Sequence, residues 1–327
     1  MYRKLLRLFF AISFYLGIIN LFYWLNKKKQ CILVFHHIIP DNLVNDSFEQ
    51  KIVCTPQNKF RSLISIVNKR FKVTTALGEP GSAIISFDDG YRAALTAVNV
   101  LDTYGNKAYF FIPLDNVDGG PLWIDLIMAW FAYAPTGTYK VLGKNVTLGS
   151  QQQRLQLFSK TIDSLYRFYD KQQLLDSLDD AFPFTKLSIE STYFECRFQG
   201  LTQEELKLLK TKGFKIGGHS VRHDILSMLS EAELKQDFNE CSKQIGILFN
   251  TNLYAYPFGH FRDVNKKVVD ACKTSDFSLA VLNEYNTVVN RYMLSRLNIS
   301  HYHSRYEIEA ALSGFMQWTK NIVRWRK

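Results

Sequence analysis

Residues 83–91 read AIISFDDGY, and this stretch decides the fold. Its first five residues are largely apolar, which is typical of a strand buried on both faces of a parallel sheet. Two adjacent carboxylates, Asp88 and Asp89, follow directly, and Gly90 permits a tight turn. The carboxyl ends of parallel strands share one rim of an α/β fold, where ligands bind. We therefore expect both carboxylates to lie at a ligand-binding rim.

Short apolar runs and helical patterns alternate on both sides of this stretch. The apolar runs predict strands at residues 31–35, 83–87, 108–112, 214–216, 253–256 and 277–282. The helical patterns predict helices at residues 56–68, 91–103, 202–212, 230–249, 264–273 and 304–317. Two capping boxes, Thr202 with Glu205 and Ser230 with Glu233, mark two of these helix starts. The alternation predicts an α/β fold with a parallel sheet and crossover helices, interrupted at about residues 114–200 by a mainly helical insertion.

Two more of these strands are followed by residues with metal-binding or catalytic chemistry. His219 and His223 follow a Gly-Gly pair, and the segment AYPFG occupies residues 255–259. Two imidazoles and one carboxylate, with positions left open for water, suit a catalytic divalent metal such as zinc. A second carboxylate beside the metal can take a proton from the bound water, whose pKa the metal lowers. Asp-Asp-Gly alone is often a turn and His-x-x-x-His is often a surface pair, but their shared placement after apolar strands is specific.

Together these motifs resemble those of the polysaccharide deacetylases, the NodB-homology or carbohydrate esterase 4 family. SFDDGY at residues 86–91 is similar to the first family motif, HSVRH at 219–223 to the second, and AYPFG at 255–259 to a variant of the third. The resemblance covers about residues 31–112 and 201–300. It implies a distorted (β/α) barrel of about seven strands, and an enzyme that removes N- or O-acetyl groups from a carbohydrate.

The resemblance also implies a role for each matching residue. Asp88 matches the general base. The ligands of a divalent metal, expected to be Zn²⁺, are matched by Asp89, His219 and His223. The backbone N–H near Phe258 matches the donor that stabilises the tetrahedral oxyanion. VFHHI at residues 34–38 is similar to the opening strand of many members, although a packed or rim-exposed pair of histidines explains it equally well.

Two departures from the family pattern leave parts of the site open. Many members carry arginine two residues before the third-motif proline, where this chain has Ala255. The late Leu-x-His motif that supplies the general acid has no clear match among the late histidines, which are His260, His301 and His303. Alternating apolar residues at 294–299 predict a late strand. Relatives with this type of third motif often carry an arginine in such a strand. We therefore expect Arg296 to orient Asp88 through two hydrogen bonds, the alternative being a surface salt bridge.

The N-terminal residues 8–25 form an uncharged apolar run that spans roughly 27 Å as a helix, close to the apolar thickness of a bilayer. We expect residues 1–30 to be an uncleaved membrane anchor, single-pass or monotopic, that places the protein at the cell membrane. A cleaved signal peptide and a buried helix of the folded domain are the alternatives. Three basic residues flank each side of the run, so its orientation is not set.

The net charge of +10 lies entirely at the two ends of the chain. Residues 1–30 carry six basic residues and residues 318–327 carry four, with no acidic residue in either segment, so residues 31–317 are formally neutral. A nucleic-acid groove would place the excess charge on the folded body, so the pattern argues against nucleic acid and favours a membrane surface. The five cysteines are dispersed with no C-x-x-C pair, which excludes a cysteine-rich zinc module and favours free thiols.

The sequence as a whole predicts a membrane-anchored, metal-dependent hydrolase whose barrel domain spans residues 31–327. Its expected substrate is an acetylated glycan or lipid-linked sugar of the cell envelope. Trp123 and Trp130 of the insertion are candidates for stacking on sugar rings, with burial against the barrel as the alternative. A catalytically inactive carbohydrate-binding homologue and a hydrolase of a different amide are the other functions left open.

Overall fold

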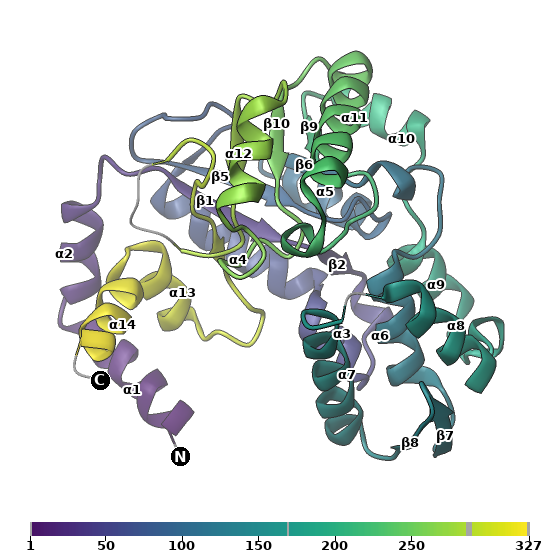
Figure 1. The fold of residues 1–327 in the computed structure, drawn as a ribbon. Helices are drawn as coiled ribbons and strands as arrows, with labels where there is room; N and C mark the ends of the chain where they lie inside the picture. The colour runs from purple at the N-terminus through teal and green to yellow at the C-terminus, as the bar shows by residue number, and fades with distance from the viewer. Residues whose placement is uncertain (1, 169, 286–289, 326–327) are drawn as a thin grey trace.

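A curved sheet of parallel strands lies at the centre of the molecule (Figure 1). The computed structural model describes residues 2–168, 170–285 and 290–325. Within them, seven strands follow the order β11-β10-β9-β6-β5-β1-β12, and a short eighth strand, β4, pairs with β5. The strand bounds are Cys31–Phe35 (β1), Lys72–Val73 (β4), Ser82–Phe87 (β5), Tyr109–Ile112 (β6), Lys215–Gly218 (β9), Leu253–Ala255 (β10), Leu279–Val281 (β11) and Leu297–Asn298 (β12). The predicted parallel sheet is confirmed.

Strands β1 and β5 set the rim on which the candidate site is built. They pair in parallel over the whole of β1, up to Phe35 opposite Phe87. Beyond the last pair, the N–H of Asp88 donates to the carbonyl of Phe35 at 3.0 Å. Because the two strands end at the same level, the residues that follow them, His36 and Asp88, leave the sheet at the same rim.

Helices cover the outer face of the sheet. Their bounds are Gln57–Arg70 (α4), Ala93–Asp102 (α5), Gln203–Thr211 (α10), Glu231–Phe249 (α11) and Lys266–Thr274 (α12). Both predicted capping boxes are present, at the starts of α10 and α11. Leu33 and Ile85 belong to the large core beneath the helices, whereas Ile32 and Ile84 belong to a small core on the other face of the sheet. Both faces of β1 and β5 are therefore buried, as their continuous apolar sequences predict.

One irregular segment closes the sheet into a barrel. After β11, Leu294 makes two backbone hydrogen bonds, of 3.0 and 2.8 Å, with β11 and the residue that follows it. A few residues later, β12 pairs with β1 at the opposite edge of the sheet. The strand predicted at 294–299 is therefore only two residues long, because the chain crosses there from one edge to the other. Arg296 lies within this crossing.

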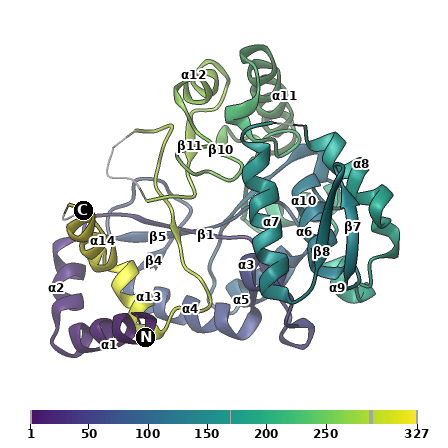
Figure 2. The same ribbon diagram turned by 60° about the horizontal axis from the view of Figure 1, so that its bottom comes forward.

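The chain between β6 and β9 adds a layer of helices at one end of the molecule (Figure 2). Its elements are Trp123–Tyr133 (α6), Gly137–Val141 (β7), Lys144–Leu148 (β8), Gln151–Leu165 (α7), Lys171–Ala181 (α8) and Ser191–Phe198 (α9). These elements have an apolar core of their own, in which Trp130 is fully buried and Trp123 is nearly so. Of the two interpretations of these tryptophans, burial therefore holds for Trp130, because its ring fills this core and is not available to a sugar.

Some short elements beside β1 have no counterpart in the sequence pattern. Strand β2 (His37–Ile39) pairs with β3 (Cys54–Pro56), and α3 (Phe48–Val53) directly precedes β3. Segments of this length are too short to show the periodicity of a helix or a strand, so only the tertiary structure reveals them.

The N-terminal apolar run folds as two helices instead of one straight helix. Helices α1 (Tyr2–Tyr15) and α2 (Ile18–Leu25) meet at 72° around Gly17, whose φ is 77°. Among the described helices, none is by itself long and apolar enough to cross a membrane, although this bent pair satisfies both conditions together. The side chains of Phe10 and Ile19 are buried in the large core. A single straight membrane helix is thus not confirmed, because the left-handed glycine and this packing bend the run.

The helix predicted at 304–317 is also divided, into α13 (Arg305–Leu312) and α14 (Phe315–Trp325). Gly314 separates the two with a φ of 85°, and a Cβ atom there would lie 2.9 Å from Nδ2 of Asn26. That amide donates a hydrogen bond of 2.8 Å to the carbonyl of Ser313. The C-terminal end of α2 is therefore joined to the bend between α13 and α14.

A fully buried arginine joins the insertion to the barrel. Arg197 of α9 donates hydrogen bonds of 2.6 Å to Glu49 of α3 and to Asp125 of α6. The hydroxyl of Tyr91 donates to the other oxygen of Asp125, also at 2.6 Å. Burial lowers the pKa of Arg197, but the two carboxylates outweigh it and hold that pKa well above its ordinary value. The three charges therefore depend on one another for their stability in the interior.

Replacing this arginine tests how far the insertion depends on it. Arg197→Met leaves two buried carboxylates without their counter-charge, so we expect the free energy of unfolding to fall by about 3–5 kcal/mol. Urea denaturation measures this quantity. The control is Arg262→Met, whose ion pair with Asp163 is solvent-exposed, and we expect it to cost about 0–1 kcal/mol. Equal stability of the two variants would contradict the prediction.

Candidate metal centre

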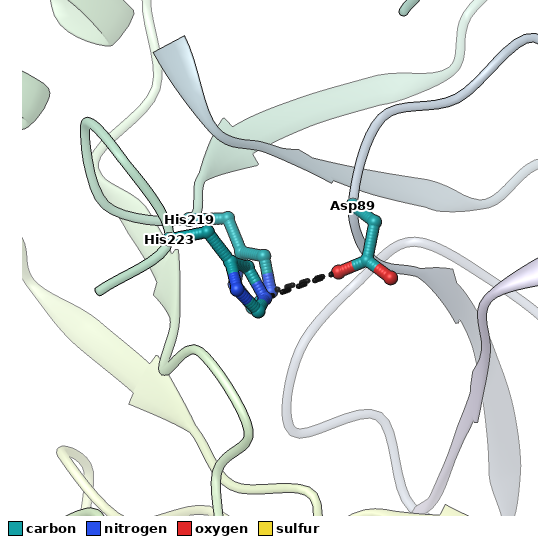
Figure 3. Close-up of side chains that lie close together, drawn as sticks. All are labelled: Asp89, His219 and His223. Atoms are coloured by element: carbon teal, nitrogen blue, oxygen red, sulfur yellow. Dashed lines mark ion pairs between the residues drawn. The ribbon is translucent and has the colours of Figure 1, made fainter. Parts of the chain in front are cut away.

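The two adjacent carboxylates at the end of β5 face different partners. Asp88 contacts Arg296 inside the barrel, and Asp89 faces two histidines from the loop after β9 (Figure 3). Asp89 has a left-handed backbone with a φ of 73°, and its carbonyl accepts a hydrogen bond of 2.6 Å from the Asn116 side chain. One carboxylate is therefore placed among metal-binding side chains while its neighbour is held apart from them.

Asp89, His219 and His223 bring three ligand atoms together. Oδ1 of Asp89 lies 3.4 Å from Nε2 of His219 and 3.3 Å from Nε2 of His223. All three ligand atoms lie within 4.8 Å of one another. Ligands bound to one cation at about 2.0–2.2 Å are themselves separated by about 3–3.5 Å. The separations and the donor types therefore fit a divalent metal such as zinc that keeps positions open for water.

One hydrogen bond fixes the ring of His219, and another holds the backbone of His223. Nδ1 of His219 lies 2.7 Å from the carbonyl of Ala255, so Nδ1 is placed to carry the proton and Nε2 is free to act as a ligand. The carbonyl of His223 accepts a hydrogen bond of 3.0 Å from Nε1 of Trp123. Trp123 therefore contacts the histidine loop through its polar edge, a contact that the sequence did not indicate.

A buried carboxylate on α11, which no motif marks, holds the histidine loop in place. Asp237 accepts hydrogen bonds from Oγ of Ser220 at 3.0 Å and from the N–H of Val221 at 2.9 Å. Burial raises the pKa of Asp237 to about 6. Ser220 and His223 both have left-handed backbones, with φ values of 70° and 54°. Such strained conformations persist only where surrounding bonds fix them, and Asp237 supplies two of those bonds.

Arg296 makes the predicted bidentate contact with Asp88. Its Nη1 and Nη2 atoms donate to the two carboxylate oxygens at 2.7 and 2.5 Å. Its Nε also donates to the carbonyl of Leu282 at 2.7 Å, and the side chain is buried. Burial raises the pKa of Asp88, but the charge of Arg296, its hydrogen bonds and the nearby histidines together outweigh this effect, so the pKa lies below its ordinary value. The alternative of a surface salt bridge is wrong, whereas the catalytic role of the pair stays a prediction.

The two histidines that follow β1 have different surroundings. His37 is buried, and its Nε2 lies 3.6 Å from Oδ2 of Asp89, on the side away from the two ligand histidines. Burial lowers the pKa of His37, which favours a neutral ring. His36 is only partly buried and lines the same pocket as Asp88 and Asp89. Of the two forms of the structural alternative, the packed one therefore fits His37 and the rim-exposed one fits His36.

Asp88, the three ligand residues and His36 line one pocket of about 330 Å³. Phe258, whose backbone is left-handed with a φ of 58°, lines it with its ring centroid 4.9 Å from that of His223. Of the late histidines, His260 and His301 line this pocket, whereas His303 lines a separate groove beside α1. The pocket thus collects each residue to which the sequence assigned chemistry except Arg296, which reaches it through Asp88.

Comparisons with known proteins agree with this geometry. A family model described as polysaccharide deacetylase matches residues 180–280, which include His219, His223 and Phe258 but not the aspartate pair. No curated protein sequence matches the chain.

The fold is similar to several solved structures at low sequence identity. A polysaccharide deacetylase from Bacillus cereus matches with a TM-score of 0.53 and 14% identity, over 87% of this chain and 69% of that one. A Streptococcus pyogenes deacetylase in complex with acetate matches with a TM-score of 0.51 and 14% identity, over 84% and 94%. A de-N-acetylase from Aggregatibacter actinomycetemcomitans matches with a TM-score of 0.51 and 14% identity, over 86% and 99%.

The order of the motifs, the matching family model and the fold are three separate lines of support. The chain therefore resembles the polysaccharide deacetylases both in its sequence motifs and in its barrel fold, and these findings together support a carbohydrate deacetylase enzyme.

Proposed function

We propose that this protein is a divalent-metal-dependent hydrolase that removes N- or O-acetyl groups from a cell-envelope carbohydrate, either a glycan or a lipid-linked sugar. The observation that carries the proposal is the placement of Asp88, held by Arg296, beside the ligand set of Asp89, His219 and His223 in one pocket. The names of two similar structures, a deacetylase with acetate and a de-N-acetylase, support acetyl removal as the reaction.

The side chains divide the chemistry between them. A cation held by Asp89, His219 and His223, expected to be Zn²⁺, would supply a Lewis acid that lowers the pKa of a water molecule at the site. The Asp88 carboxylate accepts the proton of the attacking water as general base, and Arg296 keeps that carboxylate ionised and oriented. The backbone N–H near Phe258 donates to the oxyanion that develops on the acetyl oxygen.

His36 is the residue that we propose as general acid in place of the missing Leu-x-His motif. It lines the same pocket as Asp88 and the ligand set, and it leaves the sheet at the same rim as Asp88. When the bond between the acetyl carbon and the sugar nitrogen or oxygen breaks, the imidazole gives its proton to the leaving atom. The products are acetate and the free amine or hydroxyl of the sugar.

The contact between Arg296 and Asp88 disfavours an inactive carbohydrate-binding homologue. The absence of the usual family arginine was one reason to consider that function, and Arg296 fills the place from a different part of the chain.

We further propose that residues 1–30 attach the protein to the cell membrane. In this division residues 31–327 form the catalytic domain, with the insertion at about 114–200.

The ligand set predicts which histidine the metal requires. His219→Ala removes one ligand atom, so we expect both bound metal and deacetylation of an acetylated chromogenic ester to be lost. Metal content by mass spectrometry and turnover before and after chelation measure the two effects. His260→Ala is the control, because that side chain is at the pocket but is largely exposed and lies outside the ligand set. Stoichiometric metal and full turnover in His219→Ala would remove it from the site.

The base and the acid should both affect turnover but not metal binding. Asp88→Asn keeps the shape of the carboxylate but cannot accept a proton, so we expect near-normal metal content and turnover lower by about 10²-fold or more. The residual activity should lose its acid limb. His36→Gln should lower turnover with unchanged metal content. If either variant retains the wild-type rate and profile, that residue does not have the proposed role.

Arg296→Lys tests whether a fork or merely a charge is needed at this position. A lysine keeps the charge but cannot make two parallel hydrogen bonds to Asp88, so turnover should fall sharply while metal content stays intact. Because the hydrogen bonds from Arg296 also lower the pKa of Asp88, their loss should move the acid limb of kcat/KM to higher pH even though the charge remains. Arg291→Lys is the matched control, since that exposed arginine lies in the same closing segment and bonds only to a backbone carbonyl in the described contacts. An unshifted pH profile in Arg296→Lys would contradict the positioning role.

A further inference from the structure

Exposed apolar side chains are concentrated on the helices at the two ends of the chain. About half of the large exposed apolar residues of the described chain lie on α1, α2, the turn between them and α14. Three of them are Ile12 on α1, Leu16 in the turn and Trp24 on α2, which are 49%, 70% and 60% exposed. On α14, Trp318 is 50% exposed. Apolar exposure on this scale marks an interaction surface and not a random scatter.

These three helices form one surface. Figures 1 and 2 both show α1, α2 and α14 side by side at the end of the molecule opposite the insertion. The ring centroid of Phe22 lies 4.9 Å from that of Phe315 and 5.3 Å from that of Trp318. Phe10 and Ile19 bury the inner faces of α1 and α2 in the core. The helix pair is thus fixed to the fold on one side and exposes apolar side chains on the other.

A groove between α1 and α14 has the chemistry of a lipid site. It encloses about 880 Å³, and its walls include Phe9, Met316 and Ile322. The basic side chains of Arg3, Arg7 and Lys320 also line it. The one carboxylate among the lining residues, that of Glu307, lies 3.3 Å from Arg7 and is neutralised by it. Apolar walls beside cationic groups match a lipid with an anionic headgroup.

The distribution of charge selects an anionic bilayer over a second copy of the chain. The segments 1–30 and 318–327 carry all of the net charge of +10 and have no acidic residue. Arg3, Lys4 and Lys28 are exposed on the same helices and the turn that follows them. Two such surfaces would repel each other, whereas an acidic membrane attracts them.

We propose that α1, α2 and α14 form one docking surface that lies in the plane of an anionic membrane, with an acyl chain in the groove and the lipid phosphate at Arg3, Arg7 and Lys320. This surface deepens the membrane attachment proposed above, adds the C-terminal helix to it, and does not depend on the acetyl chemistry. Ser300 lines both this groove and the metal-site pocket, so docking places the pocket near the bilayer, where a membrane-borne carbohydrate is within reach.

Vesicle binding of the full chain tests the surface. We expect strong cosedimentation with vesicles of phosphatidylcholine and phosphatidylglycerol in a 7:3 ratio (a composition of about 30% anionic lipid), and weak binding to phosphatidylcholine alone. The double variant Trp318→Ser/Ile322→Ser, called the α14 variant below, should weaken binding to the anionic vesicles by about tenfold or more. The control pair, Leu208→Ser and Ile247→Ser, removes exposed apolar side chains from α10 and α11 and should leave binding unchanged. Lys320→Gln should weaken binding about fivefold, at low salt and on anionic vesicles only.

Cysteine labelling separates docking in the plane from a transmembrane span. Arg3→Cys and Lys28→Cys, made one at a time, should both react with an impermeant maleimide added outside the vesicles, whereas a span protects one of them. Three results would overturn the proposal. One is protection of either cysteine from labelling, and another is wild-type vesicle binding by the α14 variant. The third is a stable dimer of the wild-type protein without lipid that is absent in the α14 variant. The α14 variant should keep wild-type turnover of a soluble acetylated ester, so failure of the surface is distinguishable from failure of the proposed enzyme activity.

Discussion

The bidentate ion pair between Asp88 and Arg296 is the constraint on which the barrel and its site both depend. Each partner is buried, and a buried charge without its partner costs several kcal/mol, so neither can occupy this interior alone. Asp88 ends the central strand β5, whereas Arg296 lies in the crossing segment that joins β11 to β1. The crossing of this segment from β11 to β1 therefore brings the guanidinium to the carboxylate.

Backbone strain is concentrated around the candidate metal centre. Among the described non-glycine residues with positive φ, four of seven lie at the site: Asp89, Ser220, His223 and Phe258. Each such conformation costs free energy, and it persists because the surroundings determine it. The Asn116 side chain holds the carbonyl of Asp89, and the loop after β9 is held by Asp237. These hydrogen bonds thus stabilise the strained backbone that holds the three ligand atoms close together.

The insertion contributes to the site as well as to the size of the molecule. Ile124 and Met128 of α6 form part of the pocket wall, and Trp123 of the same helix bonds to the carbonyl of His223. Arg197 ties α6 to α3 and α9 through two buried carboxylates. Because Tyr91 of the first motif donates to Asp125, the aspartate turn and the insertion are parts of one hydrogen-bonded unit. Tolerance of this region to substitution should therefore be lower than that of an ordinary surface insertion.

Local sequence determined the helices and strands and the order of the motifs. The signals for them are apolar runs, capping boxes and the residues that follow a strand, and each depends only on residues close together in the chain. Local sequence placed β1, β5 and α11 and assigned Asp88, Asp89, His219 and His223 to a common rim. Relations between distant segments were decided by the tertiary structure. The apolar N-terminal run is compatible with a straight span by length, but core burial of Phe10 and Ile19 and the left-handed Gly17 bend it into two helices. Arg197 and Asp237 carry no motif, since their roles arise only where buried groups from separate elements must satisfy one another's charges and hydrogen bonds.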